Sequence, residues 1–345
     1  MKTKILTTSK KDIETAASII KKGGLVAFPT ETVYGLGANA LDERAVAKVY
    51  EAKGRPSDNP MIVHISRASD IGQLTRMLSP DIVALIDNFW PGPLTLVVKK
   101  KPGIPDRTTG GLDTVGVRMP ESKPALDLIN MAGCPIAAPS ANLSGSPSPT
   151  RAQDVIADLD GRVDAIIAGE DCRVGIESTV IDMTSAVPTI LRPGLVTAES
   201  IEAAIGKKVE YDESLKETEA ARHVQADPAD GVSERDFKPK SPGMKYKHYA
   251  PKADMLVVEG QRENVIAEIE RLKALNERLG NKVGVILFEE RAFIEAAHDF
   301  FAKLRDLDKE DVDMILAGAL SDTDGVGFAV MNRMLKSAGY NIAKV

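Results

Sequence analysis

Groups that could bind a phosphorylated small molecule gather near the start of the sequence. Residues 29–37 read PTETVYGLG and follow the apolar run at residues 25–28, which predicts a short buried strand. Buried strands do not otherwise carry so many hydroxyl and carboxylate groups, so we expect a small-molecule site at this strand end. Lys53 and Arg55 come shortly after. Lysine is a compact point charge, whereas arginine is a planar fork suited to phosphate or carboxylate.

Two further cations, Arg118 and Arg192, lie at the ends of predicted strands beside prolines. One such arginine means little, but three arginines with Lys53 predict a cationic pocket for a polyanion such as ATP. The commoner interpretation of Lys53 and Arg55 is that they are solvated charges at the end of a helix. The loop at residues 140–150 adds hydroxyl and amide donors of the kind that hold phosphate oxygens or a carboxylate.

The four histidines and two cysteines do not predict a metal site. No two histidines have helical metal-ligand spacing, and Cys134 and Cys172 are far apart without a CxxC motif. His64 lies in a predicted strand at residues 61–65. It is equally consistent with a half-buried, hydrogen-bonded side chain and with a group that lines a pocket.

Two familiar phosphate-binding motifs are not predicted. Residues 35–40, GLGANA, match the glycine-rich dinucleotide fingerprint loosely, but that fingerprint opens directly into a helix, and here Asp42 is the better N-cap. The sequence contains no GxxxxGKS or GxxxxGKT loop. If the protein uses ATP, groups other than a Walker loop must hold the nucleotide.

Composition places the chain among ordinary globular proteins. It has 345 residues, of which 43% are hydrophobic and 27% charged, so we expect a sizeable core and two domains. The formal net charge of −6 argues against a broad basic surface for nucleic acid, although a local basic cleft is compatible with it. We find no signal-peptide core and no apolar run that could span a bilayer, so we expect a cytoplasmic protein without membrane association.

Hydrophobic periodicity predicts helices and strands that mix irregularly along the first two thirds of the chain. Helices are expected at 11–22, 43–53, 80–89, 122–131, 151–159 and 198–205. Strands are expected at 25–29, 61–65, 94–98, 114–119, 135–139, 163–168, 178–183 and 188–192. Because some strands are adjacent in the sequence, a mixed sheet is favoured over a purely parallel one. Asp42 and Thr150 are expected to cap the helices that follow them.

The chain is predicted to contain two domains and a linker. Residues 1–206 form the larger domain, residues 207–252 the linker and residues 253–345 a smaller α/β domain. Most of the linker is acidic and has few large apolar groups. Near its end, residues 241–251 read SPGMKYKHYAP, which is too aromatic and too basic for a linker that makes no specific contacts. The smaller domain is predicted to have a strand, a helix, a strand and a last helix, at 255–258, 262–278, 283–288 and 326–337.

Taken in order, these motifs resemble the threonylcarbamoyl-AMP synthase family in its long form, which has a YrdC-like domain and a C-terminal Rossmann-like domain. The resemblance covers nearly the whole chain. It is specific as a combination, although no single motif is. The matching residues are PTETVYGL at 29–36, the Lys53-x-Arg55 pair with Pro56, Asn59-Pro60, His64, Ser140-x-Asn142, Ser178-Thr179-Val180, Arg192-Pro193-Gly194 and SPGMKYKHYAP.

The resemblance implies a YrdC-like mixed twisted sheet with helices around a concave cationic cavity, plus a smaller Rossmann-like α/β/α domain. It implies a nucleotidyltransferase that joins L-threonine, bicarbonate and ATP to give L-threonylcarbamoyl-AMP and pyrophosphate. The product serves the threonylcarbamoyladenosine modification of tRNA beside the anticodon, after hand-over to a separate tRNA threonylcarbamoyl transferase complex. Mg²⁺ is implied together with ATP, and direct binding of tRNA would be weak.

The resemblance also assigns roles to residues. The L-threonine site would comprise Thr32, His64, Arg118, Ala138 and Ser178. The ATP site would comprise Arg55, Asn59, Ser140, Asn142, Ser148, Arg192 and Tyr246. Lys53 and Arg55 would be catalytic, with Lys53 near the reacting carbamate. Such catalysis works by positioning and charge neutralisation and needs no protein nucleophile.

Two other functions share this fold. The main alternative is an RNA-binding YrdC-like module without synthase activity, against which the acidity of the chain argues. A carbamoyl-transferring domain of hydrogenase-maturation proteins ranks last, because those proteins carry acylphosphatase-like and zinc-finger segments. The aromatic end of the linker is interpreted equally as a lid that closes over the pocket and as a strap that docks the second domain.

Overall fold

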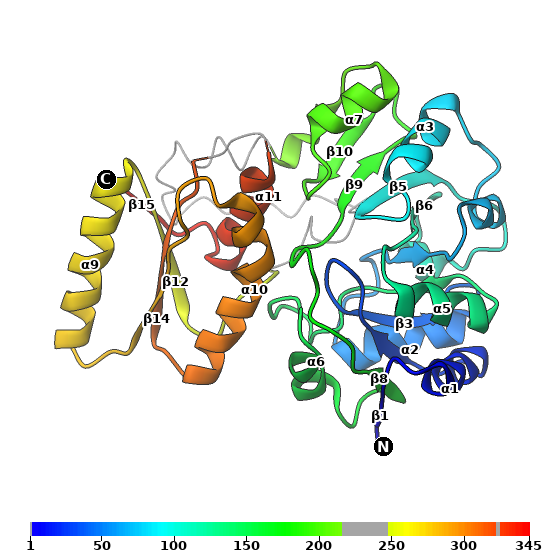
Figure 1. The fold of residues 1–345 in the computed structure, drawn as a ribbon, viewed down its shortest axis with the longest axis horizontal. Coiled ribbons are helices and arrows are strands. Elements are labelled where there is room, and N and C mark those ends of the chain that lie inside the picture. Colours follow the sequence, from blue (N-terminus) through cyan, green and yellow to red (C-terminus); the bar gives the residue numbers. More distant parts are fainter. Residues whose placement is uncertain (1, 216–247, 322–324) are drawn as a thin grey trace.

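The computed structural model describes residues 2–215, 248–321 and 325–345. The predicted linker therefore lies largely outside the described residues, and so does Tyr246. The described chain forms two sheets, a large mixed one and a small parallel one, each flanked by helices (Figure 1). The predicted fold class, a mixed α/β unit with a smaller Rossmann-like unit, is confirmed.

The larger sheet contains both parallel and antiparallel pairs. Its strands are β1 (Lys4–Leu6), β2 (Val26–Phe28), β3 (Gly35–Asn39), β4 (Ile62–His64), β5 (Leu94–Lys99), β6 (Thr114–Arg118), β7 (Ile136–Ala137), β8 (Ala165–Ile167), β9 (Thr179–Asp182), β10 (Thr189–Arg192) and β11 (Glu210–Tyr211). They follow the order β1-β8-β2-β3-β7-β4-β6-β5-β9-β10-β11. The domain boundaries at residues 206 and 252 stay predictions, and β11 extends this sheet past the first of them.

Short-range signals determine where several helices of this unit begin. The helices are α1 (Lys10–Lys21), α2 (Glu43–Lys53), the 3-10 helix η1 (Ala68–Gln73), α3 (Pro80–Phe89), α4 (Asp106–Thr109), α5 (Lys123–Ala132), α6 (Ala152–Leu159) and α7 (Ala198–Ile205). As predicted, Asp42 caps α2, and its carboxylate accepts from the amide of Arg44. The predicted cap at Thr150 is wrong. α6 begins one residue later, after Arg151, and the carbonyl of Thr150 bonds the amide of Cys172 instead.

Strand β3 was missed from the sequence because glycines suggest a turn. A Cβ on Gly37 would lie 2.7 Å from a methyl carbon of Ile136 and 2.8 Å from the ring of Phe28. Only glycine lets the neighbouring side chains pack this closely on the strand. The glycines of residues 35–40 therefore serve sheet packing, in agreement with the rejection of a dinucleotide fingerprint.

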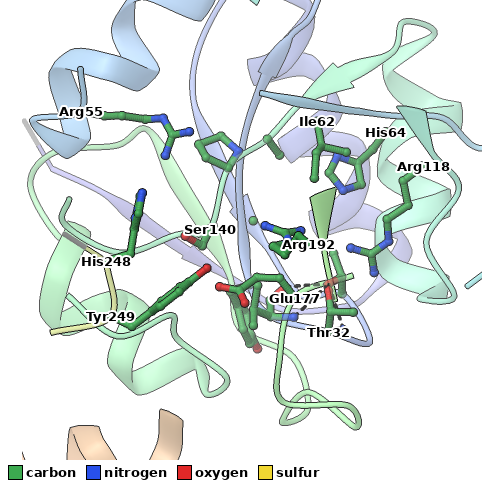
Figure 2. Close-up of a pocket in the computed structure, with 16 residues that line it drawn as sticks. Thr32, Arg55, Ile62, His64, Arg118, Ser140, Glu177, Arg192, His248 and Tyr249 are labelled. Atoms are coloured by element: carbon green, nitrogen blue, oxygen red, sulfur yellow. Dashed lines mark hydrogen bonds between the residues drawn. The ribbon is translucent and has the colours of Figure 1, made fainter. Parts of the chain in front are cut away.

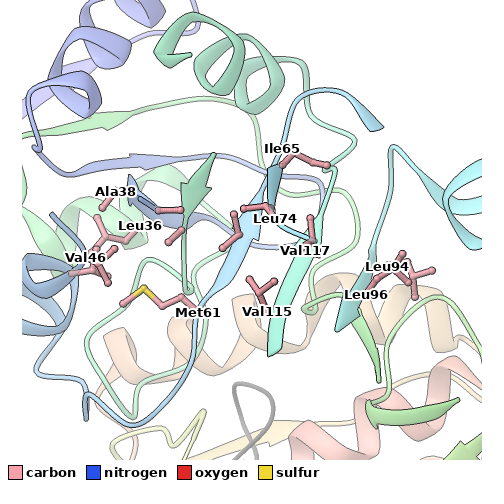
Figure 3. Packing of buried hydrophobic residues seen from close by; sticks show 14 of the residues in the cluster. Leu36, Ala38, Val46, Met61, Ile65, Leu74, Leu94, Leu96, Val115 and Val117 are labelled. Carbon is pink, nitrogen blue, oxygen red and sulfur yellow. The ribbon is translucent and has the colours of Figure 1, made fainter. Parts of the chain in front are cut away.

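A continuous hydrophobic core lies along the larger sheet. Figure 3 shows side chains from separate strands and from α2 meeting in it, among them Leu36, Val46, Met61 and Val117. All four are at most 1% exposed. Burial on this scale is the main stabilising term of the unit, and it holds the ends of β4 and β6 side by side.

The smaller unit is a four-stranded parallel sheet in the order β13-β14-β12-β15. Its elements are β12 (Asp254–Glu259), α9 (Arg262–Arg278), β13 (Val283–Ile286), α10 (Phe293–Glu310), β14 (Met314–Gly318), α11 (Val326–Ser337) and β15 (Ile342–Lys344). The sequence predicted the helices at 262–278 and 326–337 but not α10 or β14. Within the described ranges, no helix is both long and apolar enough to cross a membrane.

The two units pack against each other through α10 and α11, which lie between the small sheet and the larger unit (Figure 1). One hydrophobic cluster joins Val33 and Ile176 of the larger unit to Phe300 and Phe301 of α10. Gly175 makes this approach possible, since a Cβ there would lie 2.4 Å from the backbone of His298. The smaller unit is thus fixed beside the segment that follows β2, where the sequence predicts a site.

Candidate active site

A pocket opens where strand ends of the larger unit meet the described end of the linker (Figure 2). We call it the central pocket, and it holds about 570 Å³ of space, counting its open mouth. Its walls come from the segment after β2, the ends of β4, β6 and β10, and the segment after β7. The lining residues are Thr30, Thr32, Val33, Tyr34, Gly35, Arg55, Ile62, His64, Arg118, Ala138, Pro139, Ser140, Glu177, Arg192, His248 and Tyr249.

Three arginines are spaced along the central pocket. In Figure 2, Arg55 lies near His248 at one end, Arg118 near His64 at the other, and Arg192 between them. Burial lowers the pKa of Arg55 to about 10, so its guanidinium is still protonated at neutral pH. An elongated anion could therefore contact positive charge at more than one point along its length.

Arg118 has a counter-ion within the protein. One of its terminal nitrogens lies 2.7 Å from a carboxylate oxygen of Glu31, and its Nε donates to the carbonyl of Gly92 at 3.2 Å. Glu31 comes from the segment after β2, so this ion pair ties that segment to the end of β6. The charge of Arg118 is thereby largely balanced, and the net positive charge of the pocket rests on the other two arginines.

Hydrogen bonds from hydroxyl groups stabilise the turn in the segment that follows β2. The Oγ1 of Thr30 lies 2.9 Å from the Oγ1 of Thr32, and it also donates to the carbonyl of Val33 at 2.6 Å. Both threonines are buried and line the pocket. The small hydroxyl side chains thus lie beside apolar groups such as Ile62 and Ala138, a combination that suits a small amphiphilic ligand.

Several buried polar atoms in this region have no hydrogen-bond partner among the described residues. They include Nε of Arg55, Oδ1 of Asn59, Nδ1 of His64, a terminal nitrogen of Arg118 and Nε2 of His248. Burial lowers the pKa of His64 to about 3, with Arg118 adding to the effect, so its imidazole is neutral at neutral pH. Because buried polar groups are almost always paired, such atoms indicate a place where a ligand binds.

Lys53 does not line the pocket and instead holds part of its wall. Its ammonium donates to the carbonyl of Ser140 at 2.6 Å and to the carbonyl of Asn142. Asn142 in turn donates to the carbonyls of Leu143 and Ser146 at 2.7 and 2.9 Å. These bonds shape the loop that presents Ser140 to the pocket. A catalytic contact by Lys53 stays a prediction.

Arg192 is held by the backbone and side chain of one neighbour. Its Nε donates to the carbonyl of Ser178 at 3.1 Å, and its terminal nitrogen donates to the hydroxyl of Ser178 at 3.2 Å. The same hydroxyl lies 2.8 Å from Oγ1 of Thr95. Ser178 therefore orients Arg192 from behind, and the remaining guanidinium nitrogen is left for other contacts.

Glu177 is a pocket residue that the sequence analysis missed. Its carboxylate accepts from the hydroxyl of Ser148 at 2.6 Å and from Nε of Arg333 on α11 at 3.2 Å. Burial alone would raise the pKa of Glu177, but Arg333, Arg192 and the Ser148 bond outweigh it and hold the pKa below its usual value. The available signal was a glutamate directly before the Ser178-Thr179-Val180 motif.

The described end of the linker forms one wall of the pocket. Tyr249 lines the pocket and packs against Phe301 of α10, with 5.1 Å between ring centroids. His248 lines it too, and burial lowers the pKa of that histidine to about 3. Part of the aromatic segment therefore contacts both the pocket and the second unit, as the lid and strap interpretations each require.

The structure brings most of the predicted site residues together. Those that line the central pocket are Thr32, Arg55, His64, Arg118, Ala138, Ser140 and Arg192. Those that lie behind it, bonded to each other or to lining residues, are Lys53, Asn59, Asn142, Ser148 and Ser178. Tyr246 lies outside the described residues. The ligand roles assigned to all of these residues stay predictions.

Two family models together match almost the entire chain. The first, described as Telomere recombination, matches residues 18–194. The second, described as Threonylcarbamoyl-AMP synthase, C-terminal domain, matches residues 196–339. The central pocket lies mainly in the part of the chain that the first model matches.

Individual relatives agree with the family models. A threonylcarbamoyl-AMP synthase of Pyrococcus abyssi is 47% identical over 343 residues, 96% of each chain. One of Bacillus subtilis is 44% identical over 98% of this chain and 96% of its own. The crystal structure of P. abyssi Sua5 complexed with L-threonine has a TM-score of 0.88 at 46% identity, covering 98% of this chain and 97% of that one. The chain therefore belongs to the threonylcarbamoyl-AMP synthase family.

Proposed function

We propose that this protein joins L-threonine, bicarbonate and ATP to form L-threonylcarbamoyl-AMP and pyrophosphate in the central pocket. One observation carries the proposal. Unpartnered polar atoms of Arg55 and His64 belong to residues at opposite ends of a single pocket, which Arg192 lines between them. The proposal accordingly assigns one ligand to each end. The relatives named above are synthases, which supports this function over an RNA-binding module.

L-Threonine fits the end of the pocket that contains Arg118 and His64. Its carboxylate would contact the guanidinium of Arg118, and its hydroxyl and methyl groups would lie against Thr32 and Ala138. His64 is neutral at neutral pH and can accept or donate a hydrogen bond there without adding charge. The P. abyssi relative complexed with L-threonine supports L-threonine as a substrate.

ATP fits the end that contains Arg55 and the middle that contains Arg192. Arg192 is buried, and Arg55 is half-buried with a buried Nε, so their attraction for phosphate oxygens is only partly screened by water. Ser140 would add a hydroxyl donor from the loop that Lys53 holds in place. The α-phosphate would then lie between the two ends, next to the amine of bound threonine.

The chemistry needs positioning more than covalent help. Bicarbonate takes up a proton and loses water to give CO₂. The amine of threonine adds to CO₂ to form a carbamate and releases a proton, which balances the one taken up. A carbamate oxygen then attacks the α-phosphorus, and the bond to the bridging oxygen of the β-phosphate breaks as pyrophosphate leaves. Fixed cations stabilise the charge that develops on the phosphate oxygens.

Mg²⁺ is proposed to enter with ATP as part of the substrate. No group of three or more metal-binding side chains occurs in the described part of the chain. Glu177 lines the pocket and is already bonded to Ser148 and Arg333, and Glu31 is paired with the lining residue Arg118. Mg²⁺ commonly keeps several waters and binds through substrate phosphates, which fits these residues.

The product identifies the reaction. The purified protein is incubated with ATP, Mg²⁺, L-threonine and ¹³C-bicarbonate. The products are separated by chromatography, and their masses are determined by mass spectrometry. The proposal expects an adenylate that contains threonine and one ¹³C atom. An adenylate without the label, or none, would overturn it. A cytoplasmic location, weak direct tRNA contact and hand-over to a transferase complex stay predictions.

A further inference from the structure

Arg333 is an arginine of the second unit that reaches the wall of the central pocket. It lies on α11 and is 0% exposed. Its Nε donates to a carboxylate oxygen of Glu177 at 3.2 Å, and one terminal nitrogen donates to the backbone carbonyl of the same residue at 3.4 Å. The other terminal nitrogen donates to the carbonyls of Pro193 and, at 3.2 Å, Ala329. The guanidinium is therefore bonded on one side to its own helix and on the other to the larger unit.

Glu177 has two arginines within electrostatic reach. Both Arg333 and Arg192 hold down the pKa of its carboxyl group. The ion pair that forms, however, is with Arg333. Arg192 is bonded to Ser178, the residue next in the chain. The carboxylate thus forms its ion pair with the second unit and not with the arginine that lies in the middle of the pocket.

Removing Arg333 would leave Glu177 as a buried carboxylate without its counter-ion. An uncompensated buried charge is costly, so the carboxylate is expected to pair with the next available cation. Arg192 and Lys336 both interact with Glu177, and Arg192 is the one of the two that is buried in the pocket wall. A guanidinium paired with an internal carboxylate is less available to an external anion.

We propose that Arg333 is a positioning residue that keeps Glu177 away from Arg192 and so reserves the Arg192 guanidinium for the phosphate groups of the nucleotide. This inference rests on the proposed function in one respect, the binding of ATP near Arg192. It gives the second unit a definite part in the site. α11 supplies the charge that neutralises an acidic group in the wall of an anion-binding pocket.

The test compares four variants of the full chain. Arg333→Met removes the charge, Arg333→Lys keeps a point charge, Glu177→Gln removes the carboxylate, and the double variant Arg333→Met/Glu177→Gln removes both. Asp306→Asn is the matched control, because Asp306 bridges the same interface to Arg151 at 2.8 Å without touching the pocket wall described here. Circular dichroism establishes that each variant folds.

Binding of a non-hydrolysable ATP analogue and of L-threonine is measured separately by calorimetry. Arg333→Met is expected to weaken binding of the analogue about tenfold or more and binding of threonine less than about threefold. The double variant should bind the analogue at least about fivefold more tightly than Arg333→Met. Glu177→Gln alone should bind the analogue about threefold tighter, since the negative charge in the wall that contains Arg192 is then removed.

If the role of Arg333 were purely structural, Arg333→Met would weaken binding of both ligands to a similar extent. Adding Glu177→Gln would then not restore binding of the analogue. That result would overturn the inference, and so would unchanged analogue binding in a folded Arg333→Met variant. If Arg333→Met does not fold, Glu177→Gln decides, and weaker or unchanged binding of the analogue contradicts the inference. The proposed function is judged apart from this, by whether the wild-type protein makes the threonine-containing adenylate.

Discussion

The carboxylate of Glu31 lies 2.7 Å from the guanidinium of Arg118, and the two side chains are 1% and 5% exposed. A buried ion pair adds little net stability, but breaking it by removing one partner is strongly destabilising. The pair also determines what a ligand meets at this end of the central pocket, since Arg118 already has a counter-ion when an incoming carboxylate arrives.

Glu31→Gln is expected to lower the free energy of unfolding by about 3 kcal/mol, because Arg118 is then buried without its counter-ion. Saturating L-threonine should restore part of the loss by supplying a carboxylate. Urea unfolding with and without threonine measures both effects. The control is Asp113→Asn, whose partner Lys99 is exposed at 49%, and it should unfold at the wild-type urea concentration. Equal effects in the two variants would contradict the prediction.

Arg55→Ala is expected to raise the KM for ATP about tenfold or more, because charge-assisted bonds to phosphate are lost. The KM for L-threonine should change less than about threefold, since Arg55 lies at the other end of the pocket. Arg107→Ala serves as the control, because this arginine is 50% exposed and pairs with Glu43 at the surface. Normal ATP kinetics in Arg55→Ala would make Arg55 a structural cation.

Lys53→Met should lower both stability and activity. The carbonyls of Ser140 and Asn142 would lose a buried donor, which costs about 2 kcal/mol, and the loop that presents Ser140 would loosen. We expect the rate of pyrophosphate release to fall about tenfold or more. Lys48→Met is a matched control on the same helix, since that exposed lysine also donates to a carbonyl, that of Gly23. Similar rates in both variants would contradict this role.

Mild acid should destabilise the protein through the buried His64 and the half-buried His248. Burial lowers the pKa of His64 and of His248 from 6.5 to about 3. Between these values the unfolded chain binds more protons, so the free energy of unfolding falls as the pH drops from 6.5 toward 3. Each histidine contributes at most about 1.4 kcal/mol per pH unit.

Urea unfolding at several pH values in this window measures the slope. His64→Gln should reduce the pH dependence of the free energy of unfolding by up to the contribution of one histidine. Carboxylates contribute equally to this dependence in the wild type and in the variant. His298→Gln is the control, because that side chain is 49% exposed, and its slope should match the wild type. An unchanged slope in His64→Gln would show that His64 does not stay neutral in the folded protein.

Gly175→Ala tests the contact between the two units. Gly175 has a φ of 85°, and a Cβ there would lie 2.4 Å from the carbonyl oxygen of Ala297 on α10. Backbone strain and overpacking together should cost about 3 kcal/mol. Gly133→Ala carries strain of the same kind, with a φ of 66° and open space around it, and should cost about 1 kcal/mol. Equal losses of unfolding free energy in the two variants would mean that α10 shifts at little cost to make room for the added methyl group.

Much of this arrangement was predictable because its signals are local. The Asp42 cap, the end of α2 before Pro56 and the buried strand after Gly24 follow from residue types over a few positions. The pocket arginines were predicted because charge near proline at the ends of strands and of a helix is visible in a single sequence. In each of these cases a short stretch of chain determines the feature.

The rest depends on contacts between distant residues. Glu177 was missed because its importance comes from Arg333, which is 156 positions away. Lys53 was placed near the ligands, whereas its bonds go to a loop 87 positions later. β3 was missed because its glycines are explained only by Phe28 and Ile136 packing on them. No local pattern contains such information.

The most direct measurement is pyrophosphate release from ATP and Mg²⁺ by the purified protein, with L-threonine and bicarbonate each present or omitted, in wild type and Arg55→Ala. The account predicts that release requires both co-substrates and falls about tenfold or more in the variant at subsaturating ATP. Release that does not depend on threonine, or that is unaffected by Arg55→Ala, would contradict it.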